Sequence, residues 1–272
     1  MAPLPARTPS GYGLGWRQPA LPVRGLLLGA AAAPWAREEV NVDLTPHFRP
    51  TRNQQWLGAC TGFALAGLVD YAVDRAIRDD VWPDAPFTAS PLGIYYQERE
   101  RMGLADTDSG ASLIDGLEVL RAGLLSETDV PYVPERFRDR PSPAALTRSK
   151  LRRAVNADVL AHDEGTIVHT LASGYPVAFG AALFESFESE AVRRTGEVPF
   201  PRDTESVVGG HAMIACGVYG PPGNRRVRVR NSWGPEWGAG GYCTLPMAYL
   251  LNPGLTGELL TLRVVSPAPR RA

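Results

Sequence analysis

The hydrophobic pattern of this sequence changes its period near the middle of the chain. In the first half, apolar residues recur three and four positions apart, and a continuous helical stripe runs through Leu65, Leu68, Val69, Ala72, Val73, Ala76 and Ile77. In the second half, short apolar runs replace this spacing, and Val227 and Val229 alternate with arginines as in a half-exposed strand. Helices followed by an antiparallel sheet predict an α+β fold with two lobes.

The element boundaries follow from capping residues, glycines and prolines. A serine followed by proline is a typical helix start and a glycine a typical stop, which gives expected helices at 60–78, 90–103 and 112–122. The expected strands are 176–183, 211–219, 226–230, 241–245 and 259–265. The Pro- and Arg-rich segment 131–143 is expected to connect the lobes. The resulting division is an N-terminal arm at 1–40, a domain at 41–265 with lobes of about 41–140 and 141–265, and a disordered tail at 266–272.

Charge and cysteine content argue against several classes of protein. The 28 Lys and Arg residues nearly balance the 29 Asp and Glu residues, so no nucleic-acid partner is expected. The three cysteines, Cys60, Cys216 and Cys243, leave at least one free thiol within the chain, although a Cys216–Cys243 bridge stays open as an alternative. The fold therefore does not need an oxidising compartment.

The segment from Gly25 to Ala36 has the apolar, Ala-rich composition of a signal-peptide core. It follows a stretch broken by Pro and Gly, and it carries a proline and a tryptophan where a cleavage site would lie. We leave export open and favour a cytoplasmic over a secreted location slightly. Since no run reaches the ~18 apolar residues of a membrane helix, no membrane association is expected.

Cys60 lies at the start of the first expected helix, directly after Gly58 and Ala59. A thiol at this position feels the positive end of the helix dipole, which favours the thiolate. Gln54 lies six residues upstream, and its amide is placed to donate to an oxyanion beside the backbone N–H of Cys60. Gln55 is an alternative for this role, and a buried structural cysteine is the alternative for Cys60.

A histidine and an asparagine in the second half complete a candidate catalytic set. His211 opens an apolar strand after two glycines, which permit close approach of another segment. Asn231 is followed by Ser232-Trp233-Gly234 and, further on, by Gly240-Gly241-Tyr242. An asparagine amide can orient an imidazole ring, and an indole can shield that hydrogen bond from water.

The order Gln54, Cys60, His211, Asn231 resembles the papain family of cysteine peptidases, the C1 family. Three blocks carry the resemblance: Asn-Gln-x5-Cys, Gly-His-Ala, and Asn-Ser-Trp-Gly-x2-Trp-Gly-x2-Gly-Tyr. The match is closer to a bacterial branch of the family, through 57–61, 95–99, 108–112 and 185–189. The chain departs from many relatives at Leu57, where they have a disulfide-forming cysteine, and at Thr61, where they have tryptophan.

The resemblance implies a helical N-terminal lobe, a β-barrel-like antiparallel C-terminal lobe and an active-site cleft between them. It also implies an endopeptidase, in which Cys60 attacks a peptide carbonyl, Gln54 binds the oxyanion, and His211, oriented by Asn231, protonates the leaving amine. The polypeptide substrate would lie along Gly110 and Ala111, with Ala212 lining the pocket for the second residue before the cut and Trp233 shielding the Asn–His pair.

Two other functions use the same residues. A transpeptidase or peptide ligase resolves the thioester with an amine, and a peptide-binding module keeps the fold without turnover. No cofactor is expected, and no metal, because His47, His162 and His169 have no Cys or carboxylate at metal-ligand spacing. We expect a monomer.

The N-terminal arm is too apolar for a free tail, since Gly11–Arg37 contains Trp16, Trp35 and a run of Leu and Ala. About 40 residues precede the expected core, where papain relatives carry a long inhibitory prosegment. We therefore expect the arm to pack on the core and part of it to cross or border the cleft. The alternative is that it covers an apolar face of one lobe.

Overall fold

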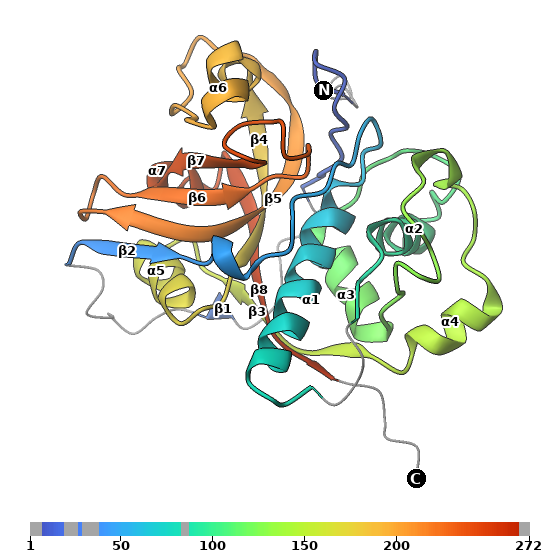
Figure 1. Cartoon of the computed structure of the whole chain (residues 1–272). Coiled ribbons are helices and arrows are strands. Elements are labelled where there is room, and N and C mark those ends of the chain that lie inside the picture. The colour runs from blue at the N-terminus through green and yellow to red at the C-terminus, as the bar shows by residue number, and fades with distance from the viewer. Residues whose placement is uncertain (1–6, 19–26, 29–37, 83–86, 267–272) are drawn as a thin grey trace.

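The computed structural model describes residues 7–18, 27–28, 38–82 and 87–266. Helices gather on one side of the molecule and strands on the other, with helix α1 at the boundary between them (Figure 1). The helical side holds α1 (Cys60–Arg78), α2 (Pro91–Arg101), α3 (Leu113–Ala122) and α4 (Pro143–Ser149). The expected α+β fold class is confirmed.

Helix α1 joins the two sides of the molecule. It packs against α2 and α3 on one side and against strands β5 (Val207–Gly220) and β8 (Thr256–Ser266) on the other. Its apolar stripe faces this core, where Leu65, Leu68 and Val69 are at most 1% exposed. The first residue of α1 is Cys60, so the helix start and its thiol lie where the two lobes meet.

Serine caps define where α2 and α3 begin. The Ser90 hydroxyl accepts a hydrogen bond from the Gly93 N–H at 2.9 Å, and the Ser112 hydroxyl accepts one from the Asp115 N–H at 3.1 Å. Both helices therefore start within a residue of the expected positions, and α3 ends before Gly123 as expected. Short 3-10 turns lie at Thr45–His47, Pro134–Arg136 and Glu185–Glu188.

The other side is an open sheet in the order β1-β3-β8-β4-β5-β6-β7, with β2 also paired to β5. All pairs are antiparallel except β1 with β3. The expected strands correspond to β4 (Val177–Phe184), β5, β6 (Arg226–Arg230), β7 (Tyr242–Pro246) and β8. The strands that were not predicted are β1 (Leu27–Leu28), β2 (Val40–Asp43) and β3 (Arg153–Leu160).

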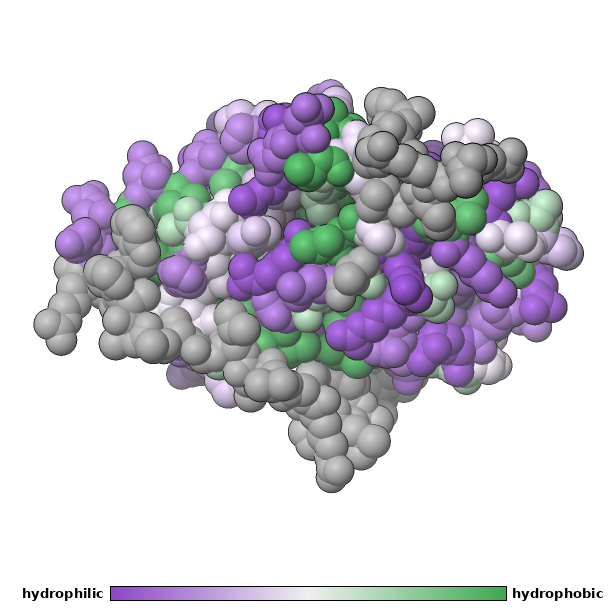
Figure 2. Space-filling view, turned by 90° about the horizontal axis from the view of Figure 1, so that it is seen from below, coloured by the Kyte–Doolittle hydropathy of each residue, from purple (hydrophilic) through white to green (hydrophobic). Residues whose placement is uncertain are grey.

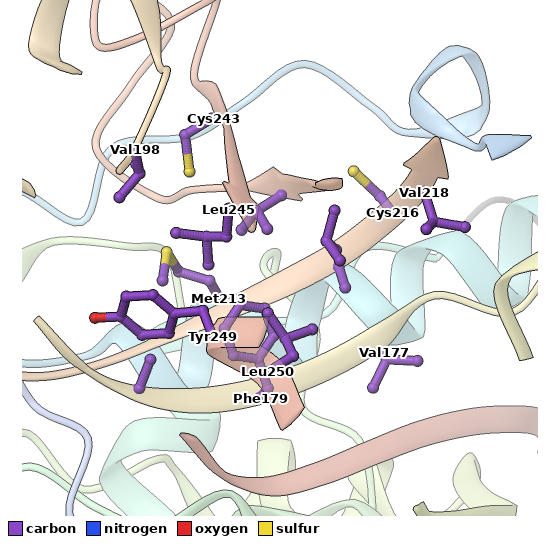
Figure 3. Packing of buried hydrophobic residues seen from close by; sticks show 14 of the residues in the cluster. Val177, Phe179, Val198, Met213, Cys216, Val218, Cys243, Leu245, Tyr249 and Leu250 are labelled. Carbon is purple, nitrogen blue, oxygen red and sulfur yellow. The ribbon is translucent and has the colours of Figure 1, made fainter. Parts of the chain in front are cut away.

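A hydrophobic core fills the sheet side beneath helices α5 (Glu164–Ala172), α6 (Glu190–Thr195) and α7 (Met247–Leu251). Cys216 and Cys243 belong to this core, and their sulfur atoms are separated in the close view (Figure 3). All three cysteines are free thiols, so the alternative Cys216–Cys243 bridge is not formed.

The surface seen from below is largely hydrophilic, with hydrophobic patches toward its middle (Figure 2). Among the described residues, no helix is long and apolar enough to cross a membrane. In the same residues, no three His, Cys, Asp or Glu side chains gather to form a metal site. Ser266, the first residue of the expected tail 266–272, belongs to strand β8. The rest of that tail and the segment 25–36, apart from the short strand β1, lie outside the described residues. The lobe boundary near residue 140 stays a prediction.

Candidate active site

Cys60 is the first residue of α1 and is fully buried. The loop before it is held by Asp108, whose two carboxylate oxygens accept the Gly58 N–H at 3.1 and 3.2 Å. Cys60 lies at the positive end of the α1 dipole, which by itself would favour the thiolate, but burial has the larger effect and raises the pKa of the thiol. The loop and the helix together fix the position of the sulfur.

His211 and Asn231 come from neighbouring strands of the sheet. His211 lies within β5, and Asn231 directly follows β6. Their side chains form a hydrogen bond between His211 Nε2 and Asn231 Oδ1 at 2.8 Å. The Asn231 oxygen also accepts the Ser232 N–H at 2.8 Å, so the His211 Nε2 is the donor. Among the described residues, the buried Nδ1 of His211 has no hydrogen-bond partner.

The structure brings Cys60 next to Ala212, the neighbour of His211 on β5, across the boundary between the lobes. The Cys60 sulfur accepts a hydrogen bond from the backbone N–H of Ala212, the residue after His211, and another from the N–H of Gly15 in the arm. Burial raises the pKa of the Cys60 thiol to about 12, although these N–H groups oppose the shift. Burial lowers the pKa of His211 to about 4, opposed by the bond to Asn231. In this conformation both groups are therefore neutral.

An aromatic cluster covers the histidine. The Trp233 ring lies 4.8 Å from the His211 ring between centroids, tilted by 33°. Phe187 and Trp237 pack edge-on to Trp233 at 5.6 and 5.2 Å. The ring of Tyr12, in the arm, stacks on Trp233 with 4.8 Å between the ring centroids and 6° between the ring planes. Trp233 thus lies beside the Asn–His pair, where the sequence pattern placed the shield.

Gln54 is buried and held through both ends of its amide. Its Oε1 accepts the Ser232 hydroxyl at 2.6 Å, and its Nε2 donates to the carbonyls of Gly13 at 3.0 Å and Leu57 at 2.9 Å. Gln55, the alternative, is exposed with φ of 57°. The amide that reaches the candidate site is therefore that of Gln54.

Residues 13–17 of the arm lie between the two lobes as an extended segment. The Gly15 carbonyl accepts the Ala111 N–H at 2.7 Å, and the Arg17 N–H donates to the Ala111 carbonyl at 2.9 Å. On the sheet side, the Trp16 N–H donates to the Gly210 carbonyl at 3.1 Å. The segment is visible in dark blue between the sheet and the helices in Figure 1. It passes directly beside Cys60, since the Gly15 backbone N–H lies against the Cys60 sulfur.

The alternation of glycines with large residues explains how the arm fits. Gly13 and Gly15 face the loop before Cys60 so closely that a Cβ on Gly15 would lie 1.7 Å from the Gly58 carbonyl oxygen. The large residues that alternate with these glycines, Tyr12, Leu14 and Trp16, point the other way into the sheet lobe. This alternation of glycines with large residues is typical of an extended strand that has no side chains on one of its faces.

The expected substrate-pairing residues lie along the arm. The pairing hydrogen bonds are made by the backbone of Ala111, while the Gly110 N–H donates to the Tyr95 hydroxyl at 3.0 Å. Gly110 has φ of 69°, and a Cβ there would lie 2.1 Å from the Gly15 carbonyl oxygen, so this position requires glycine. Ala212 pairs with Gly180 of β4 and lies against the Cys60 sulfur.

Sequence reasoning gave no role to several residues of the site, although Tyr95, Asp108 and Ser232 lie within the motifs it used. Asp108 and Tyr95 hold the loops of Gly58 and Gly110, and Ser232 orients Gln54. Glu258, a buried carboxylate, accepts the Trp16 indole N–H. For Glu258 the available signal was a single acid between Gly257 and an apolar strand, which is an unusual place for an unpaired charge.

No family model matches the chain. It is 31% identical to an uncharacterized peptidase C1-like protein of Acanthamoeba polyphaga mimivirus over 223 residues, which are 79% of this chain and 70% of that protein. It is also similar to the crystal structure of xylellain, a cysteine protease from Xylella fastidiosa, with a TM-score of 0.81 and 26% identity over 99% of this chain and 100% of that chain.

A digestive procathepsin L2 proteinase from the larval midgut of Tenebrio molitor shares the fold with a TM-score of 0.67 and 20% identity, over 94% of this chain and 81% of that chain. These similarities confirm the papain-like two-lobed fold and a cysteine-type peptidase. The chain belongs to the papain-like C1 family of cysteine peptidases.

Proposed function

We propose that this chain is an endopeptidase that cleaves polypeptides with Cys60 as nucleophile, His211 as general base and acid, Asn231 as its orienting residue and Gln54 in the oxyanion hole. The observation that carries the proposal is the His211 ring itself. Its Nε2 donates to Asn231, and its buried Nδ1 has no hydrogen-bond partner among the residues that the structure describes. The backbone N–H of the next residue on β5, Ala212, donates to the Cys60 sulfur.

The proposed reaction proceeds through a thioester. His211 takes the thiol proton, and the Cys60 sulfur bonds to the peptide carbonyl carbon, which turns the carbonyl oxygen into an oxyanion. The Gln54 amide and the Cys60 N–H stabilise this charge. His211 then gives the proton to the leaving amine as the C–N bond breaks. Water, deprotonated by His211, hydrolyses the thioester and restores the thiol.

We propose that the arm holds the enzyme in a latent form. Backbone pairing with Ala111 and the Gly15 N–H bond to the Cys60 sulfur support this reading, because a substrate strand needs the same partners. The amide of Gln54 is also engaged by the Gly13 carbonyl. Activity would thus require the segment 13–17 to leave.

We further propose that the chain belongs with bacterial members of the family. The support is the similarity to the Xylella fastidiosa cysteine protease, which covers nearly the full length of both chains. The disulfide-free core around Leu57 and Thr61 supports the same grouping.

A Gly15→Ala variant of the full chain tests the proposed peptidase activity and the proposed latency. The new methyl would meet a backbone carbonyl rather than a movable side chain, so the arm cannot seat and peptide cleavage should rise at least ~10-fold. Gln18→Ala, an exposed residue of the same arm, is the matched control and should behave as wild type.

In the Gly15→Ala background, Cys60→Ala should abolish cleavage and labelling by an epoxide inhibitor of cysteine peptidases. His211→Ala should impair cleavage more than Asn231→Ala, since the asparagine only orients the ring. Retained cleavage by the Cys60→Ala variant would rule out this nucleophile. Added amines that appear in the products in preference to water would identify a transpeptidase instead of a hydrolase.

A further inference from the structure

Glu98 of helix α2 is a buried acid that contacts the first turn of helix α1. The side chain is 0% exposed, and its Oε2 accepts the hydroxyl of Thr61, the residue after Cys60, at 2.7 Å. Among the described residues its other oxygen, Oε1, has no hydrogen-bond partner. A buried carboxyl with an unpaired oxygen destabilises the fold. Its presence beside the nucleophile therefore points to a role beyond packing.

Helix α3 leaves room for this acid. Gly116 lies inside α3, and a Cβ there would lie 2.3 Å from Glu98 Oε1 and 2.1 Å from Leu65 Cδ1 of α1. Glycine destabilises a helix interior relative to alanine, so the position is occupied by glycine because the space is needed. Helices α1, α2 and α3 thus meet around the Glu98 carboxyl.

Charged groups on three elements act on the Glu98 carboxyl. Burial has the largest effect and raises the pKa of Glu98 to about 8, while the Thr61 hydroxyl opposes this shift. The acids Asp115 on α3 and Glu258 on β8 act in the same direction as burial, and Arg99, the next residue on α2, acts against it. Glu98 is therefore a neutral acid at pH 7 and becomes a carboxylate at mildly alkaline pH.

The charge of Glu98 reaches the nucleophile. Burial is the main cause of the raised pKa of the Cys60 thiol, and the Glu98 carboxylate raises it further by charge repulsion. Water screens such a repulsion little, because both groups are fully buried. The interaction is mutual, so an ionised Glu98 favours the thiol and a Cys60 thiolate favours the neutral acid.

We propose that Glu98 is a positioning residue for the nucleophile, which holds the first turn of α1 through Thr61 and, when ionised, keeps Cys60 in the thiol form. The inference rests on the proposed function, because it takes Cys60 as the nucleophile. The Cys60 N–H, the proposed oxyanion donor, belongs to the same helical turn as Thr61. The hydrogen bond from Thr61 to Glu98 therefore fixes the sulfur and this donor together.

A titration of the thiol tests the effect of the charge without any turnover. The background is the full-length Gly15→Ala, His211→Ala variant, which unseats the arm and removes the imidazole. The rate of Cys60 alkylation by iodoacetamide is followed against pH by mass spectrometry of the peptide that carries Cys60. Adding Glu98→Gln keeps an oxygen for the Thr61 hydroxyl and removes the charge, so the midpoint should fall by at least ~1 pH unit. Glu100→Gln, an exposed acid two residues further along α2, is the matched control and should leave the midpoint unchanged.

Turnover tests the hydrogen bond. In the Gly15→Ala background at pH ~6.5, where Glu98 is neutral, Thr61→Val should lower kcat about 10-fold because the first turn of α1 loses its anchor. Thr61→Ser keeps the hydroxyl and should return kcat to within ~3-fold of the parent. Glu98→Gln, which keeps the bond, should also stay within ~3-fold at this pH.

A thiol midpoint that Glu98→Gln leaves in place, or that Glu100→Gln lowers equally, overturns the proposal. Equal kcat values for Thr61→Val and Thr61→Ser overturn the positioning role of the hydrogen bond. If Glu98→Gln does not fold, as judged by circular dichroism, Glu98→Met replaces it, because methionine is uncharged, similar in length and needs no partner. A lowered midpoint in a chain whose Gly15→Ala parent cleaves no peptide would support the effect of Glu98 on the thiol and refute the proposed reaction instead.

Discussion

At the scale of single residues, Gln54 shows how a buried amide is oriented. Its oxygen is bound by the Ser232 hydroxyl, so its NH2 group must point toward the carbonyls of Leu57 and Gly13. Gln54 also donates its backbone N–H to the Ser232 carbonyl at 2.8 Å. The residue after the catalytic asparagine candidate therefore controls the amide that is proposed to bind the oxyanion.

This arrangement predicts unequal effects of two substitutions in the Gly15→Ala background. Gln54→Ala removes the donor and should lower kcat by roughly 10²–10³-fold. Ser232→Ala keeps the donor but frees the amide to turn, and it should lower kcat by a smaller factor, about 10-fold. Gln55→Asn, which tolerates the left-handed backbone of that position, is the control. A larger loss at Gln55 than at Gln54 in steady-state kinetics would shift the oxyanion assignment by one residue.

At the scale of secondary-structure elements, α2 supports the site without contributing a reacting group. The hydroxyl of its buried Tyr95 donates to Asp108 at 2.5 Å and accepts the Gly110 N–H at 3.0 Å. Arg99, one turn later and fully buried, donates to the carbonyls of Ala105, Thr107 and Phe137. The helix thus anchors the loop that pairs with the arm.

Tyr95→Phe should therefore weaken substrate binding more than it slows the chemical step. Loss of the hydroxyl leaves the Gly110 N–H and one Asp108 oxygen without this partner, so the loop becomes looser and KM should rise about 10-fold with kcat changed less than ~3-fold. The measurement is a full kinetic profile in the Gly15→Ala background. Tyr96→Phe, the neighbouring tyrosine on the same helix, serves as the control. A fall in kcat at unchanged KM would place Tyr95 in the chemistry rather than in binding.

At the scale of the whole molecule, regular periodicity separates what the sequence could predict from what it could not. The α1 stripe and the alternation in β6 gave boundaries that match the structure. Strand β3 was missed because register shifts at Asn156 interrupt its alternation and place polar residues irregularly. The catalytic candidates were found because each lies in a short sequence motif, and such a motif can be read without knowing how the strands pair.

The remaining parts of the site depend on contacts between segments far apart in the chain. Trp16 and Glu258 are separated by 242 positions, and nothing in either local sequence indicates that they meet. Likewise, Gly180 has no local turn signal, because its space is needed only for the arm. Such pairings are fixed by the fold as a whole, and residue patterns describe only each element by itself.

The seated arm also predicts how latency depends on pH. Burial lowers the pKa of His211 to about 4 while the arm is in place, whereas a hydrated imidazole titrates near 6.5. Between these two pH values, the open form, from which the arm has left, binds more protons than the seated form, in which the arm is in place. Falling pH therefore favours release of the arm, and the effect is complete below pH ~4. Cys60, with its pKa raised to about 12, acts in the opposite range and favours release as pH rises above ~8.5. The seated form should thus be most stable near neutral pH.

The measurement is the ratio of kcat/KM for wild type to kcat/KM for Gly15→Ala as a function of pH. The pH profile of Gly15→Ala alone reports the chemistry without the arm. This ratio should be lowest near pH 7 and should rise at least ~10-fold by pH 4.5. Protonation of Glu258 has the opposite effect on the arm. Burial raises the pKa of this carboxyl in the seated form, so that falling pH stabilises the seated form through Glu258. Adding Glu258→Gln to both variants should therefore steepen the acid rise. A ratio that stays flat between pH 7 and 4.5 would mean that His211 titrates alike in both forms, and that the arm does not control its access to water.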